Sequence, residues 1–449
     1  MSAPTRGGLT VEVTPSQRLV KLRRLLMLFL LVNAIGLGVG VAIWVYALEI
    51  EAVNGLRLQL ASRLPRLLVL PLMGALGGGL AGALISGVEP GAKGSGIIQV
   101  MVWLRGLPVP MGWKVALVKL LASGVAIGGG LPVGPEGPSI QIGASMAKES
   151  AGVVGAKGST RRSAVAIGSG AGLAAIFHSP LGGLAYTLEE LLKKADIRVN
   201  AIATFATFAT VAWTRLLSAA PTSPAWMRNL TPVVVDPSRI DTFRLVDIPF
   251  LLLLGVLAGL LAMQYQRWVL RLLLLFRRWR LPPWQLLPLV GLVIGVGAAA
   301  LPSSFDSPDK LGFDALLGLT TPVLALLALV VQAIGTAVAV AAEAPGGILA
   351  PALVVGASLG TLLREFSLVV VHYAPTSLLF AGGAAFLGAL TRTPLTAILL
   401  SFELSKDYAL LLPIGFAVLA AIAVADLFER DTLFDLMREE TEEELRRAG

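Results

Sequence analysis

Long apolar runs constrain this chain more than any other feature of its sequence. A bilayer core is about 30 Å thick and an α-helix rises about 1.5 Å per residue, so roughly 20 consecutive apolar residues can cross it. Seven runs come close to this length: Leu25–Leu48, Leu67–Ile85, Val199–Leu217, Ile248–Leu275, Trp284–Leu301, Pro322–Ala342 and Leu410–Leu427. The pattern predicts an all-α, polytopic membrane protein and excludes an ordinary soluble enzyme.

Shorter apolar pieces lie between these runs, interrupted by Gly and Pro. They cover residues 95–107, 115–127, 138–148, 163–176, 180–192, 347–363, 378–390 and 394–404. A helix that stops inside a bilayer leaves backbone groups that neighbouring protein, water or a bound ion must satisfy. We therefore predict broken, tilted helices around a buried site.

Charged residues make up 14% of the chain, whereas soluble domains have about 25%. The net charge of +8 would suggest nucleic-acid binding in a soluble protein. Here basic residues gather at the ends of apolar runs, which is typical of orientation by the positive-inside rule. Before the first run these are Arg18, Lys21, Arg23 and Arg24. We expect a lipid bilayer as partner, no nucleic acid, and both termini in the cytoplasm.

Cysteine is absent and there are two histidines. This composition excludes disulfides and thiolate metal sites, and it leaves little for zinc chemistry. No glycine-rich loop is followed by the Lys-Ser or Lys-Thr of a phosphate loop. We expect no metal, no cofactor and no enzymatic activity.

Two sequence blocks recur at nearly the same distance. Pro138–Met146 (PSIQIGASM) matches Pro351–Leu359 (PALVVGASL) at an offset of 213, and Ser179–Glu189 matches Thr393–Glu403 at an offset of 214. One match between apolar helices would be weak evidence, but two at nearly the same offset indicate an internal duplication. We expect the two halves to be inverted, because repeats with broken helices usually surround a midplane site, although the sequence does not show orientation directly.

The duplication divides the chain into segments. A cytoplasmic N-terminal segment, 1–24, precedes a first membrane half at 25–218 and a polar, Pro-rich linker at 219–246. The second membrane half covers 247–428, and a C-terminal helix and tail cover 429–449.

Three glycine-rich loops precede apolar helical pieces: GSGII at Gly94–Ile98, GPEGP at Gly134–Pro138 and GGILAP at Gly346–Pro351. Glycine lets the backbone turn tightly, and the helix that follows directs free N–H groups back toward the loop. Several such helix N-termini in a dry interior would bind an anion without a full countercharge. The alternative is that these glycines only allow helices to pack closely.

Acidic residues within the apolar part are the second functional signal. They are Glu136, Glu189, Glu190, Glu343 and Glu403. A charged carboxylate in a membrane is costly, so such residues often bind ions or carry protons. We expect Glu136, within its glycine loop, to occupy the anion's place when charged and to leave it when protonated. For Glu189 and Glu403 a helix cap or salt bridge is at least as good an interpretation.

Lys119 is a basic residue in an otherwise apolar run. It could tune the field at an anion site, or its side chain could simply reach toward the membrane surface. The sequence leaves both alternatives open.

In order and spacing, five motifs resemble the CLC family of chloride channels and chloride/proton exchangers. The motifs are GSGI, GPEGP followed by SIQIG, AGLAAIFHSPLGGLAYTLEEL, APGGILAP and TRTPLTAILLSFEL. The resemblance extends from about residue 25 to 436 and implies a homodimer. Each subunit would have its own chloride pathway, built from two inverted halves whose helix N-termini meet at a midplane site.

The resemblance also implies roles for individual residues. Ser95 and Gly96 belong to the loop that ligates the central anion, and the backbone N–H groups of Ile348 and Leu349 face the same anion. Glu136 matches the external gating glutamate, and Glu190 matches the internal glutamate that passes protons in exchangers. Lys119 matches a buried lysine near the pathway.

This chain departs from the family pattern at several positions. Ile98 replaces a proline, Pro135 replaces a basic residue, and Leu349 replaces a phenylalanine. Phe434 aligns with the tyrosine whose hydroxyl completes the central anion site, so it also belongs to the predicted site but cannot donate that hydrogen bond. Glu343 stands where small residues are usual; it would oppose the anion or hold a proton. The cytoplasmic CBS domains of many relatives are not expected, which is typical of prokaryotic members.

Together these features predict chloride transport, with chloride and protons as the transported ions. The leading hypothesis is chloride/proton antiport with Glu136 as gate. The alternative is a passive voltage- or pH-gated chloride channel, which Phe434 and the altered loops favour.

Overall fold

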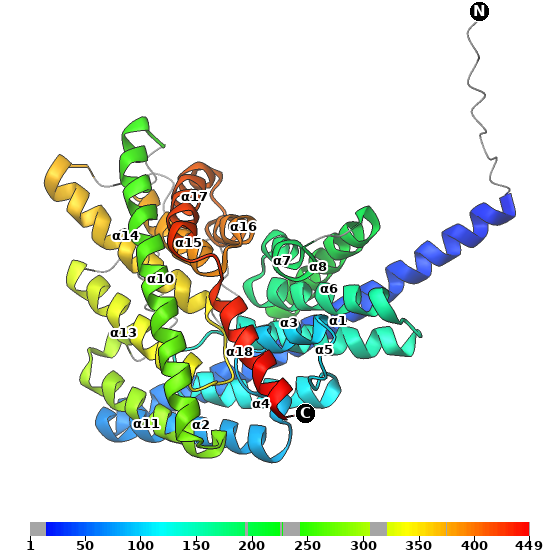
Figure 1. The fold of residues 1–449 in the computed structure, drawn as a ribbon, viewed down its shortest axis with the longest axis horizontal. Coiled ribbons are helices and arrows are strands. Elements are labelled where there is room, and N and C mark those ends of the chain that lie inside the picture. The colour runs from blue at the N-terminus through cyan, green and yellow to red at the C-terminus, as the bar shows by residue number, and fades with distance from the viewer. Residues whose placement is uncertain are drawn as a thin grey trace, which may run out of the picture.

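The computed structural model describes residues 15–193, 196–224, 227, 243–305, 321–373 and 375–448, and within these ranges the fold is all-α (Figure 1). The first half contains α1 (Pro15–Arg63), α2 (Arg66–Gly87), α3 (Ile97–Leu104), α4 (Trp113–Gly128), α5 (Glu136–Val153), α6 (Gly158–Phe177), α7 (Pro180–Tyr186) and α8 (Ile197–Ser218). The second contains α10 (Ile248–Trp279), α11 (Pro283–Ala300), α13 (Pro322–Ala341), α14 (Leu349–Val371), α15 (Ser377–Thr391), α16 (Pro394–Ser405) and α17 (Leu411–Phe428). The C-terminal helix α18 (Leu433–Ala448) packs against α3, α10 and α15, and so touches both halves.

Each of the five predicted segments falls partly outside the described residues. The residues concerned are 1–14 of the N-terminal segment, 194–195 of the first half, 225–226 and 228–242 of the linker, 306–320 and 374 of the second half, and 449 of the tail. Residues 15–24 belong to α1, which continues without a break to Arg63.

Eight described helices are long and apolar enough to cross a membrane, which confirms the prediction of a polytopic membrane protein. One of them corrects the sequence analysis. The piece at 347–363 was expected to be too short, yet it belongs to α14, which has 23 residues. Pro351 lies in the first turn of α14, where proline interrupts no helical hydrogen bond, so the helix continues past it. α5, which has Pro138 in its first turn, likewise reaches 18 residues, and α6, which contains no proline, reaches 20.

Other helices are as short as predicted. α3 has 8 residues, α7 has 7 and α16 has 12. A π-helical segment, η2 (Thr187–Leu192), directly follows α7. The first residue of α3, Ile97, is buried, whereas the C-caps of α3 and α16, Arg105 and Lys406, are exposed.

Equivalent helices of the two halves cross each other through glycine. The offset of the sequence repeat relates α2 to α11, and a Cβ at Gly74 would lie 2.3 Å from the carbonyl oxygen of Gly291. Farther along α2, Gly78 faces Leu287 and Gly82 faces Pro283, so the two helices run antiparallel. Because equivalent spanning helices run in opposite directions, the two halves are inverted.

The same helix contact also recurs inside each half. A Cβ at Gly143 of α5 would lie 2.1 Å from the carbonyl oxygen of Gly168 on α6. At the equivalent place in the second half, a Cβ at Gly356 of α14 would lie 2.2 Å from the carbonyl oxygen of Gly382 on α15. These repeated backbone contacts confirm that the halves are homologous.

Candidate functional site

Two of the three glycine loops meet at the boundary between the halves. The N–H of Gly134 donates to the carbonyl of Gly347 at 2.8 Å, and the N–H of Gly347 donates to the carbonyl of Gly134 at 2.6 Å. These two glycines are equivalent under the repeat offset of 213. The pair fixes the start of α5 against the start of α14.

The Glu136 side chain packs against the hydrogen-bonded pair Gly134 and Gly347. It is 0% exposed, and its Oε1 accepts a hydrogen bond from the N–H of Leu349 at 2.6 Å. A Cβ at Gly134 or Gly347 would lie 2.0 or 2.2 Å from a carboxylate oxygen, so both glycines make room for the side chain. Leu349 is the first residue of α14, where free N–H groups and the helix dipole favour negative charge. The carboxylate therefore occupies a position suited to an anion.

The other oxygen of Glu136, Oε2, is buried and makes no hydrogen bond within the described part of the chain. A buried carboxylate oxygen without a donor is costly. Protonation or movement of the side chain would relieve that cost.

The third loop, around Ser95, packs against the same place. A Cβ at Gly137 would lie 2.4 Å from the carbonyl oxygen of Ser95 and 3.0 Å from the Cα of Gly347. The Ser95 hydroxyl, in a residue that is 8% exposed, accepts from the N–H of Ile97 at 3.3 Å. The starts of α3, α5 and α14 thus converge, as the sequence predicted for an anion site.

Gly96 is held by its own helix. It caps α3 with a φ of 92°, a conformation that favours glycine, and its N–H donates to Oε1 of Gln99 at 3.0 Å. The Nε2 group of Gln99 in turn donates to the carbonyl of Lys93 at 2.9 Å. The Gly96 N–H is thus already satisfied, and Gln99 is a positioning residue that the sequence analysis missed.

Lys119 donates hydrogen bonds to the segment that leads into the Ser95 loop. Its fully buried ammonium donates to the carbonyls of Ala92 at 2.9 Å and Gly94 at 2.5 Å, with Lys93 at 3.5 Å. These bonds fix the carbonyls just before Ser95. The side chain therefore does not extend toward the membrane surface.

Glu343 lies outside the spanning helices, next to the Ser95 loop. Its carboxylate pairs with Lys93 at 3.2 Å and with Arg277 at 3.3 Å, and its carbonyl accepts from the N–H of Gly94 at 2.8 Å. Burial alone would raise the pKa of this carboxyl, but Lys93 and Arg277 outweigh it and hold the pKa below the usual value. Glu343 is therefore a paired carboxylate, and its negative charge is largely compensated.

The same basic residues bind the C-terminal helix. Arg277 pairs with Glu440 at 3.6 Å and with Glu444 at 3.4 Å, both on α18. These ion pairs join α18 to Arg277 of α10, and Arg277 in turn pairs with Glu343 of the turn before α14. Figure 1 shows α18, in red, crossing the region where the two halves meet.

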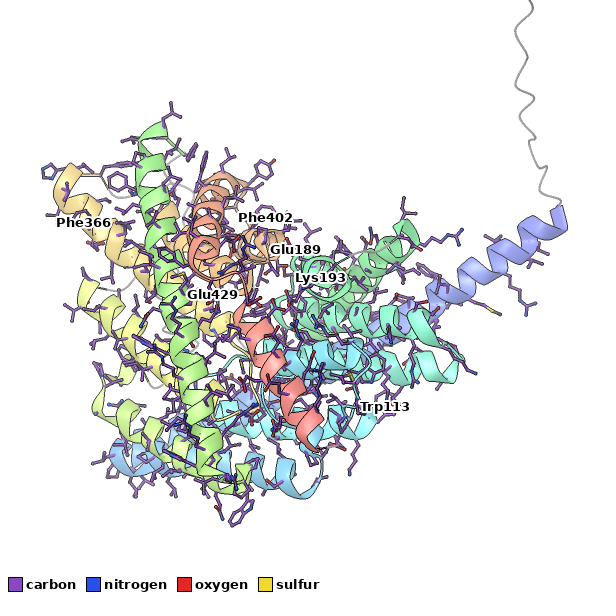
Figure 2. The ribbon with its side chains drawn as sticks, in the orientation of Figure 1. Trp113, Glu189, Lys193, Phe366, Phe402 and Glu429 are labelled. Atoms are coloured by element: carbon purple, nitrogen blue, oxygen red, sulfur yellow. The ribbon has the colours of Figure 1, made fainter. Side chains whose placement is uncertain are left out.

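Glu190 lies on η2, in a different part of the molecule from the Glu136 contacts. It is 6% exposed, and its buried Oε1 has no hydrogen-bond partner among the described residues. An open pocket of about 480 Å³ adjoins it. The pocket is lined by Leu188, Glu189, Glu190, Lys193, Thr391, Arg392, Arg430, Thr432 and Asp435. Figure 2 shows Glu189 and Lys193 close together on this side of the molecule.

Phe434 is the second residue of α18 and is 2% exposed, and it directly precedes Asp435 of that pocket. Its ring is packed into the core, where it offers no hydrogen-bond donor. Among the described contacts, none joins Glu190 or Phe434 directly to Glu136.

Glu189 and Glu403 cap helices in opposite halves. Glu189 accepts from the N–H groups of Leu395 at 2.8 Å and Thr396 at 2.7 Å, at the start of α16. Glu403 accepts from the N–H of Gly182 at 2.9 Å at the start of α7, and from the hydroxyl of Ser179. The structure thus matches the helix-cap interpretation of both residues, and the exchange of caps follows the inverted symmetry.

Comparisons with known proteins agree with this architecture. The family model described as "Voltage gated chloride channel" matches residues 77–426. A crystal structure of a slow cyanobacterial Cl⁻/H⁺ antiporter is 26% identical, with a TM-score of 0.80 over 92% of this chain and 97% of that chain.

Two further structures share the fold at lower identity. A eukaryotic CLC transporter is 23% identical, with a TM-score of 0.78 over 93% of this chain and 74% of that chain. A CLC-type fluoride/proton antiporter is 18% identical, with a TM-score of 0.71 over 95% of this chain and 99% of that chain. Since the family match covers most of the sequence and includes all three converging loops, this multi-pass membrane protein belongs to the voltage gated chloride channel (CLC) family.

Proposed function

We propose that this protein exchanges chloride for protons across a membrane, with Glu136 as gate and proton acceptor. The observation that carries the proposal is the hydrogen bond from Leu349 N–H to the Glu136 carboxylate at the start of α14. A side-chain carboxylate there stands where a transported anion would bind. The similarity to a cyanobacterial Cl⁻/H⁺ antiporter supports the same reading.

The exchange follows from competition for one position. While Glu136 is charged, it holds the N–H group of Leu349 and keeps an anion out. Once protonated, it loses most of its attraction for that helix terminus and leaves, and chloride takes its place on the N–H groups of Ile348 and Leu349, near Ser95. Each departure of the Glu136 side chain from this position therefore requires a proton, which couples the movements of the two ions.

Glu190 serves as the inner proton station in this proposal. It is buried, one of its oxygens has no partner among the described residues, and it adjoins the open pocket beside η2. Solvent in that pocket would supply or remove its proton. Lys119 keeps the Ser95 loop in place, and no cofactor is required.

The arrangement in the membrane completes the proposal. Residues 25–218 and 247–428 form the two inverted halves, the termini lie in the cytoplasm, and two subunits with separate pathways form a homodimer. The anti-parallel crossing of α2 and α11 supports the inversion.

A passive chloride channel is the second candidate, and Phe434 is the observation that favours it. A central site without the hydroxyl donor binds chloride less tightly, because a hydrogen bond to a charged group contributes about 1.5–3 kcal/mol. Weak central binding would let chloride pass without a matching proton.

Purified protein in liposomes under a chloride gradient separates the two candidates. For an exchanger, the chloride gradient drives protons against the proton gradient. The reversal potential then departs from the chloride equilibrium value. A reversal potential at the chloride equilibrium value, with no proton movement, would establish the channel instead.

A further inference from the structure

Two polar side chains, Gln332 and Thr336, lie one turn apart on α13, which is one of the candidate membrane spans. Gln332 is 7% exposed and Thr336 is fully buried. Residues four apart share one face of a helix, so both side chains point to the same neighbour. Burying a polar group within a membrane is costly unless the group has a hydrogen-bond partner, and the partners of these two indicate their role.

The two side chains form a chain of hydrogen bonds that leaves α13. The Nε2 group of Gln332 donates to Oγ1 of Thr336 at 3.0 Å, and the Thr336 hydroxyl donates to the carbonyl of Pro132 at 2.6 Å. A threonine hydroxyl within a helix often donates to the carbonyl four residues earlier, as Thr210 of α8 does with Ala206 at 2.7 Å. Because a hydroxyl has one proton, Thr336 forgoes that bond within its own helix to hold Pro132.

Pro132 belongs to the loop that leads into the gate, Glu136. Its ring lies against Gly335, where a Cβ would be 2.9 Å from the Cγ of Pro132, so the absence of a side chain lets the loop approach α13. Two residues later, Gly134 makes its paired hydrogen bonds with Gly347, and Glu136 follows as the first residue of α5. Since proline also has a fixed φ, a displacement of the Pro132 carbonyl carries into the short stretch before the gate.

The internal repeat relates these two residues to others that hold a loop of the site. At the repeat offset of 213, Gln332 corresponds to Lys119, and Thr336 likewise corresponds to Ser123. Lys119 donates to the carbonyls of the segment that leads into the Ser95 loop. The equivalent helices α4 and α13 thus each direct a polar side chain to a carbonyl of a loop that enters the anion site. On α13 the groups are an amide and a hydroxyl, so they fix the loop without adding a charge to it.

We propose that Thr336, oriented by Gln332, is a positioning residue that sets how tightly chloride and proton movements are coupled. Its bond holds the loop before Glu136 so that the charged carboxylate reaches the N–H of Leu349 and keeps chloride out. Without the hydroxyl, the Pro132 carbonyl is released, the carboxylate closes the site less completely, and chloride passes without a matching proton. The proposal rests on the chloride/proton exchange proposed above and assigns its tightness to a contact between the two halves.

Thr336→Val in the full chain, reconstituted in phosphatidylcholine liposomes, tests the proposal. Valine keeps the branched shape of threonine and replaces the hydroxyl with a methyl group. The number of protons moved per chloride, measured in the same liposomes, should fall about two- to tenfold, the factor that one net hydrogen bond contributes to an equilibrium, while chloride flux persists. Thr336→Ser retains a hydroxyl and should retain the wild-type ratio, and a ratio as low as that of Thr336→Val would count against the inference.

Thr210→Val is the matched control. It makes the same substitution at a threonine that is also 0% exposed, but whose hydroxyl donates within its own helix. The expected result is a changed ratio of protons to chloride in Thr336→Val alone. A structural role alone would lower the unfolding temperatures of both valine variants in detergent and leave both ratios at the wild-type value, and that result would overturn the inference.

Gln332→Leu gives a second test that leaves Thr336 in place. It removes the amide that orients the Thr336 hydroxyl, so the ratio of protons to chloride should fall here too. The double variant with Thr336→Val should fall no further than Thr336→Val alone, because Gln332 acts through Thr336. A wild-type ratio in Gln332→Leu, or additive losses in the double variant, would contradict that role.

Failure of this inference is distinguishable from failure of the proposed exchange. A wild-type protein that couples protons to chloride, together with a Thr336→Val variant of the same ratio, would overturn the inference alone. Absence of proton movement in the wild type would overturn the proposed exchange and the inference with it.

Discussion

Glu136 and Leu349, which meet through a 2.6 Å hydrogen bond, occupy equivalent positions in the two halves, 213 residues apart. The duplication therefore placed the same backbone turn on both sides of one site. The first copy contributes a carboxylate and the second contributes an N–H donor. An inverted repeat brings such equivalent turns together because they flank its pseudo-twofold axis.

The first prediction concerns the charge of Glu136. Glu136→Gln keeps the size of the side chain and its acceptor oxygen but cannot take up a proton, so proton flux in liposomes should vanish while chloride flux persists. Leu349→Ala keeps the backbone N–H and should retain proton flux. Proton coupling that survives in Glu136→Gln would remove Glu136 from the role proposed here.

The second prediction concerns Phe434. Phe434→Tyr supplies a hydroxyl at the start of α18, and a donor to a charged group contributes about 1.5–3 kcal/mol, equivalent to about tenfold or more in affinity. Chloride binding to the purified protein, measured by isothermal titration calorimetry, should tighten accordingly. Phe434→Leu removes the ring without adding a donor and is the control. Equal affinity in all three proteins would place the hydroxyl outside the chloride site.

The third prediction concerns Glu343 and pH. Because its pKa is lowered in the folded protein, its contribution to stability is complete above the unfolded pKa of about 4.3 and disappears as the pH falls through the folded value. Near neutral pH, Glu343→Gln should therefore lose up to about 1 kcal/mol of stability. Thermal unfolding in detergent should show a gap between wild type and variant that closes in acid. A gap that widens in acid would show that the ion pairs with Lys93 and Arg277 do not stabilise the fold.

Features of the fold and the site that have a local sequence pattern could be predicted, and those that depend on other parts of the chain could not. The glycine loops and Glu136 were predictable because a glycine turn followed by an apolar helix has a distinct pattern. The length of α14 was not, because Pro351 looks like a break although a first-turn proline leaves the helix intact. The length of α1 was not predictable either, because the apolar run ends at Leu48 whereas the helix continues to Arg63.

Contacts between distant segments were beyond the reach of the sequence. A lysine in an apolar run does not reveal that its ammonium will bind three carbonyls of a loop about 25 residues earlier, as Lys119 does. The pairing of Glu343 with Lys93 and Arg277 likewise depends on how the halves fold together. The sequence showed which groups are costly to bury, and only the structure showed what satisfies them.

The fourth prediction concerns the exchanged caps. Glu189→Ala removes two acceptors from the N-terminus of α16, and Glu403→Ala does the same for α7. Loss of a helix cap costs about 0.5–2 kcal/mol, so each variant should unfold at a lower temperature in detergent. Glu429→Ala, at the end of α17, is a control without such a role. Wild-type unfolding temperatures in both cap variants would show that these bonds do not hold the halves together.

The last prediction concerns the crossing of α2 and α11. At Gly78 a Cβ would lie 2.3 Å from the carbonyl oxygen of Leu287, a distance that real Cβ atoms do not reach, so Gly78→Ala should force the helices apart. Overpacking of this kind costs about 1–3 kcal/mol, and here the obstacle is backbone that cannot rotate away. Gly87→Ala, on the same helix with nothing within 4 Å of the added Cβ, changes the same residue type without the clash. Size-exclusion profiles in detergent should show loss of the folded peak for Gly78→Ala only; equal profiles would mean that the inverted halves tolerate a wider crossing than their glycines suggest.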